Sequence, residues 1–432
     1  MRVIKFMVNS ETTPPYGGRI ESAPRELEPR PFENTIVALD VDGVLVRPLA
    51  YRQAVRSTIT FFAEHIGVDP EEFMVDDRLR IPGRNMSYFE AEGIHDPWDV
   101  SAIIVSLMKL KKAGITVSNS EALNIFRRDS DPQSHPPDVL LKCFRSRYNR
   151  EVPEVIRDIA RTLSRTRDPF RNEVTSVFQE FVLGRKTFEE TYDKPSRTGA
   201  EESLITTKDQ SLIDDNGRAE IIKISQLGGM VVIYTGRPGL PPYDVERKHA
   251  DGYAPEAELA VGKSRVSPIG IVSMGSMEWL GRITGTPVES LTKPNPTQAL
   301  ATILAGLRRK KVDKKVLLDA YEWEKTGEVP EEIRPFIGSE EKLKLVVAED
   351  STSGVRAFIN ARKILEEEGI KVELTGIGVH DANYEKHMAF LRLARGEGLD
   401  AIDMNSGIKE GIIRYSYSVR GRAEFRDIQD NS

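Results

Sequence analysis

The segment ALDVDGVLV, residues 38–46, follows an apolar run with two aspartates and a glycine. The run, Thr35–Leu39, has the length and the β-branched side chains of a buried strand. Asp40 and Asp42 are two residues apart, so in an extended segment they project to the same side. Gly43 then allows the backbone to turn sharply after the pair. This segment therefore predicts a strand that presents two carboxylates at its carboxyl end.

Two carboxylates placed in this way have a chemical use. An aspartate is an oxygen nucleophile that is already ionised at neutral pH, so Asp40 needs no activating base to accept a phosphoryl group. The carboxyl group of Asp42 can protonate a leaving group and later activate water. A surface turn of the Asp-Gly type after a strand has the same local sequence, so the segment alone leaves both interpretations open.

Two further segments carry groups suited to an anion. VVIYTGRPG, residues 231–239, offers the hydroxyl of Thr235 and the unhindered amide of Gly236 at the end of a predicted strand. LTKPNPTQAL, residues 291–300, places Lys293 just before a predicted helix, where an ammonium group can neutralise a phosphate and a nucleophile together. Taken singly, these two segments are better explained as an ordinary strand-to-helix turn and a solvated lysine beside a helix start.

A fourth segment, LVVAEDSTSGV, residues 345–355, leads a buried strand directly into Glu349 and Asp350. Crowding like charges at a buried strand end is unfavourable unless a cation compensates them. Magnesium prefers carboxylate oxygens, so the pair indicates a metal site.

The order of predicted elements indicates the architecture. From about residue 216 strands and helices alternate, which predicts a parallel sheet covered on both faces with its ligand site beyond the carboxyl ends of the strands. The predicted strands of this block are 230–234, 269–272, 343–348, 372–379 and 400–404, and the predicted helices are 296–310, 354–368 and 383–395. The strand at 35–39 belongs to the same sheet.

Residues 51–215 are predicted to be mostly helix and loop, with helices at 51–65, 100–112, 152–165 and 174–183. This block is therefore an insertion after the first strand of an α/β domain. The predicted organisation is an irregular extension (1–30), a catalytic core (31–50 and 216–432) and a helical domain (51–215).

In this order, the four segments resemble the four motifs of the haloacid dehalogenase (HAD) superfamily. These motifs are Asp-x-Asp-Gly, Thr-Gly-Arg, Lys-Pro-x-Pro and Glu-Asp-Ser-x-x-Gly-Val. The resemblance covers residues 34–47 and 220–405, and it implies a three-layered α/β/α Rossmann-like core with a parallel sheet. The helical insertion corresponds to what subfamily I calls a C1 cap. It is larger than usual, and residues 311–342 are longer than the usual link between the third and fourth motifs.

The resemblance also implies a role for each residue. Asp40 would be the nucleophile, Asp42 the general acid and base, and Lys293 the group that steadies both phosphate and nucleophile. Thr235 and Gly236 would hold the phosphoryl oxygens. The implied ligands of Mg2+ are Asp40, the main-chain carbonyl of Asp42, Asp350, and Glu349 directly or through water.

We therefore expect a magnesium-dependent phosphatase that acts on a small phosphorylated metabolite through an aspartyl-phosphate on Asp40. A phosphotransferase or phosphomutase of the same superfamily would keep the same residues and stays an alternative. A dehalogenase is disfavoured because that activity does not keep the second aspartate, Asp42. A non-catalytic binding module on this fold is the remaining alternative, although such modules usually lose a motif aspartate or the lysine.

Composition bounds the other expectations. The 432 residues are 39% hydrophobic and 30% charged, with a net charge of −6, which favours a globular protein without nucleic acid or membrane as partner. Cys143 is the only cysteine, so intramolecular disulfides are excluded and a cytoplasmic location is expected. A role of residues 311–342 in a homo-oligomer stays open. Among six histidines, only His380 follows a predicted strand at the active-site edge.

A basic stretch lies in the helical insertion. Arg157, Arg161 and Arg165 recur at four-residue spacing, which stacks them along one face of a helix. One interpretation is a solvated face paired with Glu154 and Asp158. The other is a stripe that faces the cleft and recognises a second anionic group on the substrate.

Overall fold

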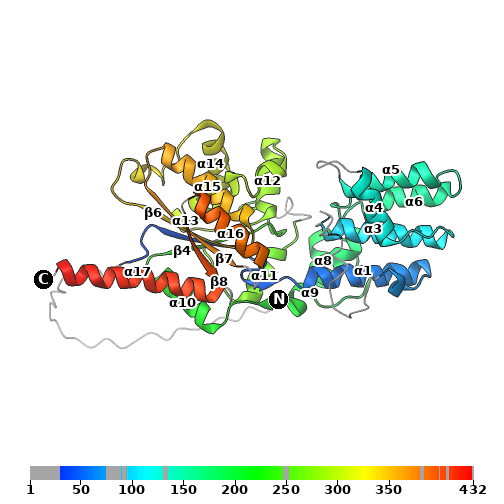
Figure 1. Cartoon of the computed structure of the whole chain (residues 1–432), viewed down its shortest axis with the longest axis horizontal. Coiled ribbons are helices and arrows are strands. Elements are labelled where there is room, and N and C mark those ends of the chain that lie inside the picture. Colours follow the sequence, from blue (N-terminus) through cyan, green and yellow to red (C-terminus); the bar gives the residue numbers. More distant parts are fainter. Residues whose placement is uncertain are drawn as a thin grey trace, which may run out of the picture.

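The computed structural model describes residues 30–73, 89, 94, 96–129, 135–246, 253–379, 384–397, 399–404 and 408–430. Residues 1–29 of the predicted extension and His380 lie outside this described part of the chain. Figure 1 shows a sheet enclosed between two layers of helices, with a helical domain beside it.

The sheet has six parallel strands in the order β5-β4-β1-β6-β7-β8. The strands are β1 (Thr35–Leu39), β4 (Met230–Tyr234), β5 (Gly270–Val272), β6 (Leu343–Glu349), β7 (Val372–Val379) and β8 (Asp400–Met404). The central strand β1 pairs with β4 on one side and β6 on the other. Every residue of β1 is buried, as expected for a parallel strand covered on both faces. The six strands predicted from the sequence are confirmed.

Alternate side chains of β1 point into different layers. The core helices are α10 (Asp215–Gln226), α11 (Glu256–Ser264), α12 (Met274–Thr284), α13 (Pro296–Leu307), α14 (Lys314–Thr326), α15 (Thr352–Glu367), α16 (Tyr384–Glu397) and α17 (Ile408–Asp430). Ile36 and Ala38 join the apolar cluster formed with helices α12 to α16, whereas Val37 and Leu39 join the cluster formed with α10 and α17. This period-two pattern produces the predicted three-layered α/β/α architecture.

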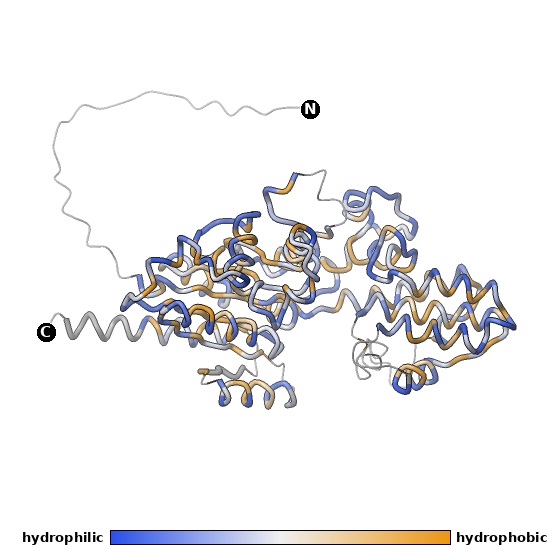
Figure 2. The backbone as a smooth tube through the Cα atoms, turned by 90° about the horizontal axis from the view of Figure 1, so that it is seen from above, coloured by the Kyte–Doolittle hydropathy of each residue, from blue (hydrophilic) through white to orange (hydrophobic). Residues whose placement is uncertain are grey.

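The helical domain consists of α1 (Ala50–Ile66), α3 (Pro97–Lys112), α4 (Asn119–Asp129), α5 (Pro136–Tyr148), α6 (Pro153–Leu163), α7 (Glu173–Leu183), α8 (Arg185–Tyr192) and α9 (Leu204–Lys208). Figure 2 shows apolar residues recurring along the helices of this domain, as burial of one face requires. The helix predicted at 100–112 begins earlier, because Asp96 caps it through the Trp98 amide at 2.9 Å and Pro97 occupies its first position.

A short antiparallel ribbon joins the two parts of the protein. The chain leaves the core through β2 (Val46–Arg47) and returns through β3 (Gln210–Ser211), and these two segments pair with each other. The domain boundaries predicted at residues 51 and 215 fall beside this ribbon. Buried side chains of α1, such as Ala54 and Val55, belong to the same apolar cluster as β1, so the packing is continuous across the junction.

Residues 311–342 are part of the core rather than a free loop. The helix α14 buries Val316, Leu317, Ala320 and Trp323 in the cluster that it shares with α13. A 3-10 turn at Arg334–Phe336 then leads towards β6. Among the described helices, none is both long and apolar enough to cross a membrane.

Replacing Ile36 by alanine tests the packing of the central strand. The side chain of Ile36, on β1, is fully buried against α13. Gly306 on that helix has no side chain, so the helix can approach Ile36 closely. The Ile36→Ala variant should lose about 3 kcal/mol of unfolding free energy in urea titrations, because it leaves a cavity in a close-packed interior. Ile283→Ala, at a position 58% exposed, is the control and should change stability by less than about 0.5 kcal/mol. Equal losses in the two variants would contradict this account of the core.

Candidate active site

Asp40 lies where the central strand ends and is only 6% exposed. Its amide donates to the carbonyl of Ala348 on β6 at 3.0 Å, so the sheet itself fixes the start of the turn that contains Asp40 and Asp42. Burial raises the pKa of the Asp40 carboxyl, Lys293 acts to lower it, and the charges of Asp42 and Asp350 raise it further. The carboxylate therefore depends on nearby positive charge to stay ionised.

Lys293 provides positive charge at this point. Its Nζ lies 3.2 Å from Asp40 Oδ1, forms an ion pair with Glu349, and donates to the carbonyl of Tyr234 at 3.3 Å. Burial acts to lower the pKa of Lys293, but Asp40 and Glu349 together raise it above its usual value. The ammonium group therefore stays protonated at neutral pH. The structure places Lys293 beside Asp40, the residue that the sequence analysis predicts to be the nucleophile.

Three carboxylates converge beside Lys293. One oxygen from each of Asp40, Glu349 and Asp350 lies within 4.8 Å of the others. Burial, followed by the charge of Asp40, raises the pKa of Glu349 to about 8, against the opposing effect of Lys293. Gly354 makes room for this buried side chain, because a Cβ at residue 354 would overlap the Glu349 carboxylate.

The three carboxylates differ in the contacts that they already make. Both oxygens of Glu349 are engaged, one by Lys293 and the other by the hydroxyl of Ser351 at 3.2 Å. Oδ2 of Asp350 accepts from Lys386 at 2.6 Å. The candidate metal ligands are all carboxylate oxygens, which suit a hard divalent cation such as Mg2+ or Ca2+. Asp40 and Asp350 are better suited than Glu349 to bind such a cation directly.

The glycine of the first motif is required by this packing. Gly43 has a positive φ of 72°, and a Cβ at this position would lie 2.5 Å from Asp350 Oδ2. The turn after Asp42 is therefore pressed directly against the end of β6, which brings the first and fourth motifs together.

Thr235 and Gly236 follow β4 at the same edge of the sheet. The Thr235 hydroxyl accepts from the amide of Arg237 at 3.2 Å, which leaves its own proton to donate to an anion. A Cβ at Gly236 would meet nothing within 4 Å, so the backbone here borders open space. Gly236 also lines the cavity described below together with Asp42. The structure places both residues at the carboxyl edge of the sheet, and their role in holding phosphoryl oxygens stays a prediction.

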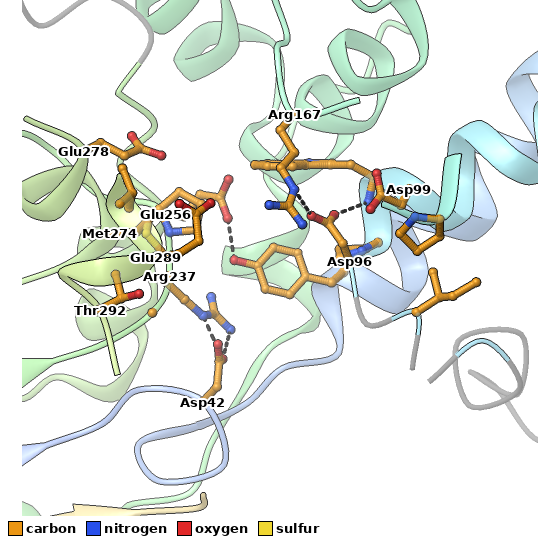
Figure 3. A pocket seen from close by; sticks show the side chains of 18 residues that line it. Asp42, Asp96, Asp99, Arg167, Arg237, Glu256, Met274, Glu278, Glu289 and Thr292 are labelled. Atoms are coloured by element: carbon orange, nitrogen blue, oxygen red, sulfur yellow. Dashed lines mark hydrogen bonds and ion pairs between the residues drawn. The ribbon is translucent and has the colours of Figure 1, made fainter. Parts of the chain in front are cut away.

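Asp42 is held by a residue to which sequence reasoning gave no role. Arg237 contacts Asp42 Oδ1 through Nε at 2.7 Å and Nη2 at 2.5 Å (Figure 3). The same Nη2 lies 2.8 Å from Oδ2 of Asp209. Arg237 could have been found from the sequence, because it is the third residue of the Thr-Gly-Arg motif. Asp209 lies outside all four motifs, so the sequence offered no signal for it.

A cavity of about 720 Å³ lies between the core and the helical domain. The core contributes Asp42, Gly236 and Arg237, and the helical domain contributes Trp98 and Arg167, among others. Figure 3 shows Asp96, Asp99 and Arg167 facing Arg237 and Asp42 across this space. The cavity therefore has room for a leaving group much larger than a phosphate.

The helical side of the cavity carries two neighbouring groups of polar contacts. Arg167 Nε donates to Asp96 at 2.9 Å, and Asp99 contacts both the Thr166 hydroxyl and His135, the latter at 3.2 Å. Burial raises the pKa of Asp96, Asp99 adds to this effect, and Arg167 opposes it. The hydrogen bond to Asp99 raises the pKa of His135 above its usual value. No role in the site was assigned to these residues from the sequence, because separate helices and loops contribute them and no local pattern brings them together.

The arginine stripe of α6 does not line the cavity. Arg157 pairs with Glu154 at 2.8 Å and Arg161 with Asp158 at 3.2 Å, and both arginine side chains are more than two-thirds exposed, at 69% and 77%. Arg165 lies beyond the end of the helix with a positive φ of 54°. The structure supports the solvated-face interpretation and contradicts the cleft-facing one.

Glu256 is a fully buried carboxyl group in the cavity wall. The hydroxyl of Tyr51, on α1, donates to it across the junction between the domains. Burial raises the pKa of Glu256 to about 7, although its hydrogen bonds and Arg237 act to lower it. Its charge state therefore changes near neutral pH.

Glu256→Gln should change how stability depends on pH. Because the folded pKa lies above the unfolded value of 4.5, the contribution of protonated Glu256 is complete below 4.5 and is lost as the pH rises through about 7. Urea titrations from about pH 5 to about pH 8 should show the variant gaining on the order of 3 kcal/mol relative to the wild type. Glu331→Gln, on the surface, is the control. Parallel pH profiles for the wild type and Glu256→Gln would contradict the assignment.

No protein-family model matches this chain, and no curated protein is similar to it. A solved X-ray structure of a Northeast Structural Genomics Consortium target is similar, with a TM-score of 0.56 and 12% sequence identity. The similarity covers 89% of this chain and 99% of that chain. At this identity it concerns the fold alone, which is an α/β core with a helical region.

Proposed function

We propose that this protein is a magnesium-dependent phosphohydrolase of the HAD superfamily that acts on a small phosphorylated metabolite. The observation that carries the proposal is the arrangement around Asp40. A buried carboxylate lies 3.2 Å from the ammonium group of Lys293 and follows the same strand as Asp42, which faces a cavity with Gly236. This combination suits nucleophilic attack on a phosphoryl group.

The proposed reaction has two steps, phosphoryl transfer to Asp40 and hydrolysis of the resulting acyl phosphate. Asp40 attacks phosphorus and forms an acyl phosphate, while the bond to the ester oxygen breaks and Asp42 donates a proton to that oxygen. Asp42 then takes a proton from water as the water attacks phosphorus, which releases inorganic phosphate and regenerates the Asp40 carboxylate. Lys293 offsets the negative charge that accumulates beside the nucleophile.

Asp40 and Asp350 would hold the magnesium ion, with Glu349 acting directly or through water and the main-chain carbonyl of Asp42 as the remaining predicted ligand. The buried carboxylate cluster supports this assignment, because three acidic groups within 4.8 Å leave negative charge for a cation to offset. When bound, magnesium supplies charge stabilisation for the transferring phosphoryl oxygens.

Transfer to an acceptor other than water is the second candidate. A phosphotransferase uses the same residues, and the volume of about 720 Å³ leaves room for an acceptor alcohol next to Asp42. The size of the cavity also favours a small-molecule substrate over a polymer. We further propose that the reaction takes place in the cytoplasm. Comparison of phosphate release with transfer to added alcohols separates hydrolysis from phosphotransfer.

Asp40→Asn should abolish the release of phosphate from an aryl phosphate and from a panel of phosphorylated metabolites. The amide is isosteric with the carboxylate but is a poor nucleophile, so the loss should exceed about a thousandfold while the protein stays folded. Asp313→Asn is the matched control, since Asp313 is a buried carboxylate that caps α14 outside the cavity. A wild-type rate for Asp40→Asn would disprove the central assignment.

Removal of divalent cations should stop the reaction. In excess chelator the rate of phosphate release should fall to background, because the charge on the transferring oxygens is no longer offset, and added magnesium should restore it. Calcium titrated in place of magnesium serves as the control, since it prefers a larger and more flexible coordination shell and should support little turnover. Unchanged turnover in excess chelator would exclude a metal role for the Asp40, Glu349 and Asp350 cluster.

A further inference from the structure

Asp209 ties together three segments that are far apart in the sequence. It lies on the segment that returns from the helical domain, between α9 and β3, and is 1% exposed. Its Oδ1 accepts from the amide of Ala50 at 2.8 Å, at the point where α1 leaves the core. Its Oδ2 accepts from Arg237 Nη2 at 2.8 Å, in the turn after β4.

Arg237, which contacts Asp209, also contacts Asp42. The guanidinium group is 2% exposed and contacts Asp42 through two nitrogens, at 2.7 and 2.5 Å. Arg237 also lies over the ring of Tyr51, and the distance from Arg237 Cζ to the ring centroid is 5.0 Å. The planar guanidinium is therefore fixed in position by Asp209 and Tyr51. Tyr51 lies in the first turn of α1 and Asp209 between α9 and β3, where the chain enters and leaves the helical domain, and we call these two places the inter-domain segments.

The charges explain why these contacts depend on one another. One guanidinium serves two carboxylates, and burial raises the pKa of Asp209 while Arg237 acts to lower it. A buried carboxylate without its counter-charge is strongly unfavourable, so Asp209 holds Arg237 firmly. Loss of the charge on Asp209 would leave Arg237 anchored mainly by Asp42, whose own position would then be less restricted.

We propose that Asp209 is a positioning residue that fixes Asp42, the general acid, through Arg237. The inference rests on the proposed function, because it concerns the placement of the group that protonates the leaving oxygen. The proposal also gives the two inter-domain segments a part in the chemistry. The positions of Asp209 and Tyr51 determine the position of Arg237, and Arg237 in turn determines that of Asp42.

Misplacement of a general acid has a distinctive kinetic effect. Proton donation matters most when the leaving group is a poor one, such as an alkoxide, and little when it is an activated phenolate. An error of about 1 Å in the placement of such a group is enough to reduce the rate substantially. A purely structural defect, by contrast, reduces the turnover of both kinds of substrate together.

The test compares Asp209→Asn with Asp313→Asn on an alkyl phosphate and on an activated aryl phosphate. The control is matched, because Asp313 is also buried, accepts a backbone amide at a helix start (Val316, 2.8 Å), and pairs with a cation (Lys310, 2.5 Å). We expect Asp209→Asn to lose roughly ten times more kcat on the alkyl than on the aryl substrate. Asp313→Asn should leave the ratio of the two rates unchanged.

Two further variants keep the test decisive. Arg237→Lys retains a charge for Asp209 but cannot reach both carboxylates, so it should fold and show the same dependence on the leaving group. In the background of Asp42→Asn, the Asp209→Asn change should have no further effect on that dependence, because the two residues act on one step. Circular dichroism and thermal unfolding verify that each variant is folded.

The outcomes separate the inference from the function on which it rests. If Asp40→Asn is inactive and Asp42→Asn mainly affects the alkyl phosphate, but Asp209→Asn and Arg237→Lys leave the ratio unchanged, the inference is wrong and the proposed function stands. Additive effects of Asp209→Asn and Asp42→Asn would also overturn it. If the wild type releases no phosphate from any substrate, or Asp40→Asn keeps its rate, the proposed function fails and the inference fails with it.

Discussion

The convergence of Asp40, Glu349 and Asp350 around Lys293 is the constraint on which the rest of the site depends. Burial disfavours the anionic forms of Asp40 and Glu349, and the proximity of the three carboxylates adds repulsion, so the cluster needs compensating positive charge. The parallel sheet brings these groups together, because β1 and β6 end side by side and the loop before α13 places Lys293 at the same edge. The glycines at 43 and 354 allow the backbone to approach the crowded carboxylates.

A second group of buried charges connects this edge to the helical domain. Asp42, Arg237 and Asp209 form a continuous set of ion pairs that ends at the amide of Ala50, where α1 begins. Tyr51 reaches back to Glu256 in the core. The helical domain is thus attached through its polar contacts as well as through shared apolar packing, and these polar contacts lie in or beside the cavity wall.

Much of the core could be predicted from the sequence, because the patterns that indicate its strands and helices lie within a few consecutive residues. The strands are short apolar runs whose ends coincide with Asp40, Thr235 and Glu349, and both faces of each strand are buried. The helix predicted at 100–112 begins at Pro97 instead, since capping by Asp96 outweighs the apolar periodicity as a start signal. The spacing of the arginines on α6 was ambiguous, because periodicity gives a shared helix face but does not say what that face meets.

The sequence by itself determined the parallel sheet, the place of the helical insertion, and the position of Asp40, Thr235 and Glu349 at or just after the strand ends. These follow from patterns within a few residues of one another and from the rule that parallel strands present their carboxyl ends together. Only the tertiary structure decided the partners of Asp42 and the lining of the cavity. Asp209 lies 159 residues from Ala50 in the chain, and no local pattern records such a contact. These contacts arise from the way the two inter-domain segments pack against the turn after β4, which periodicity and motif spacing do not encode.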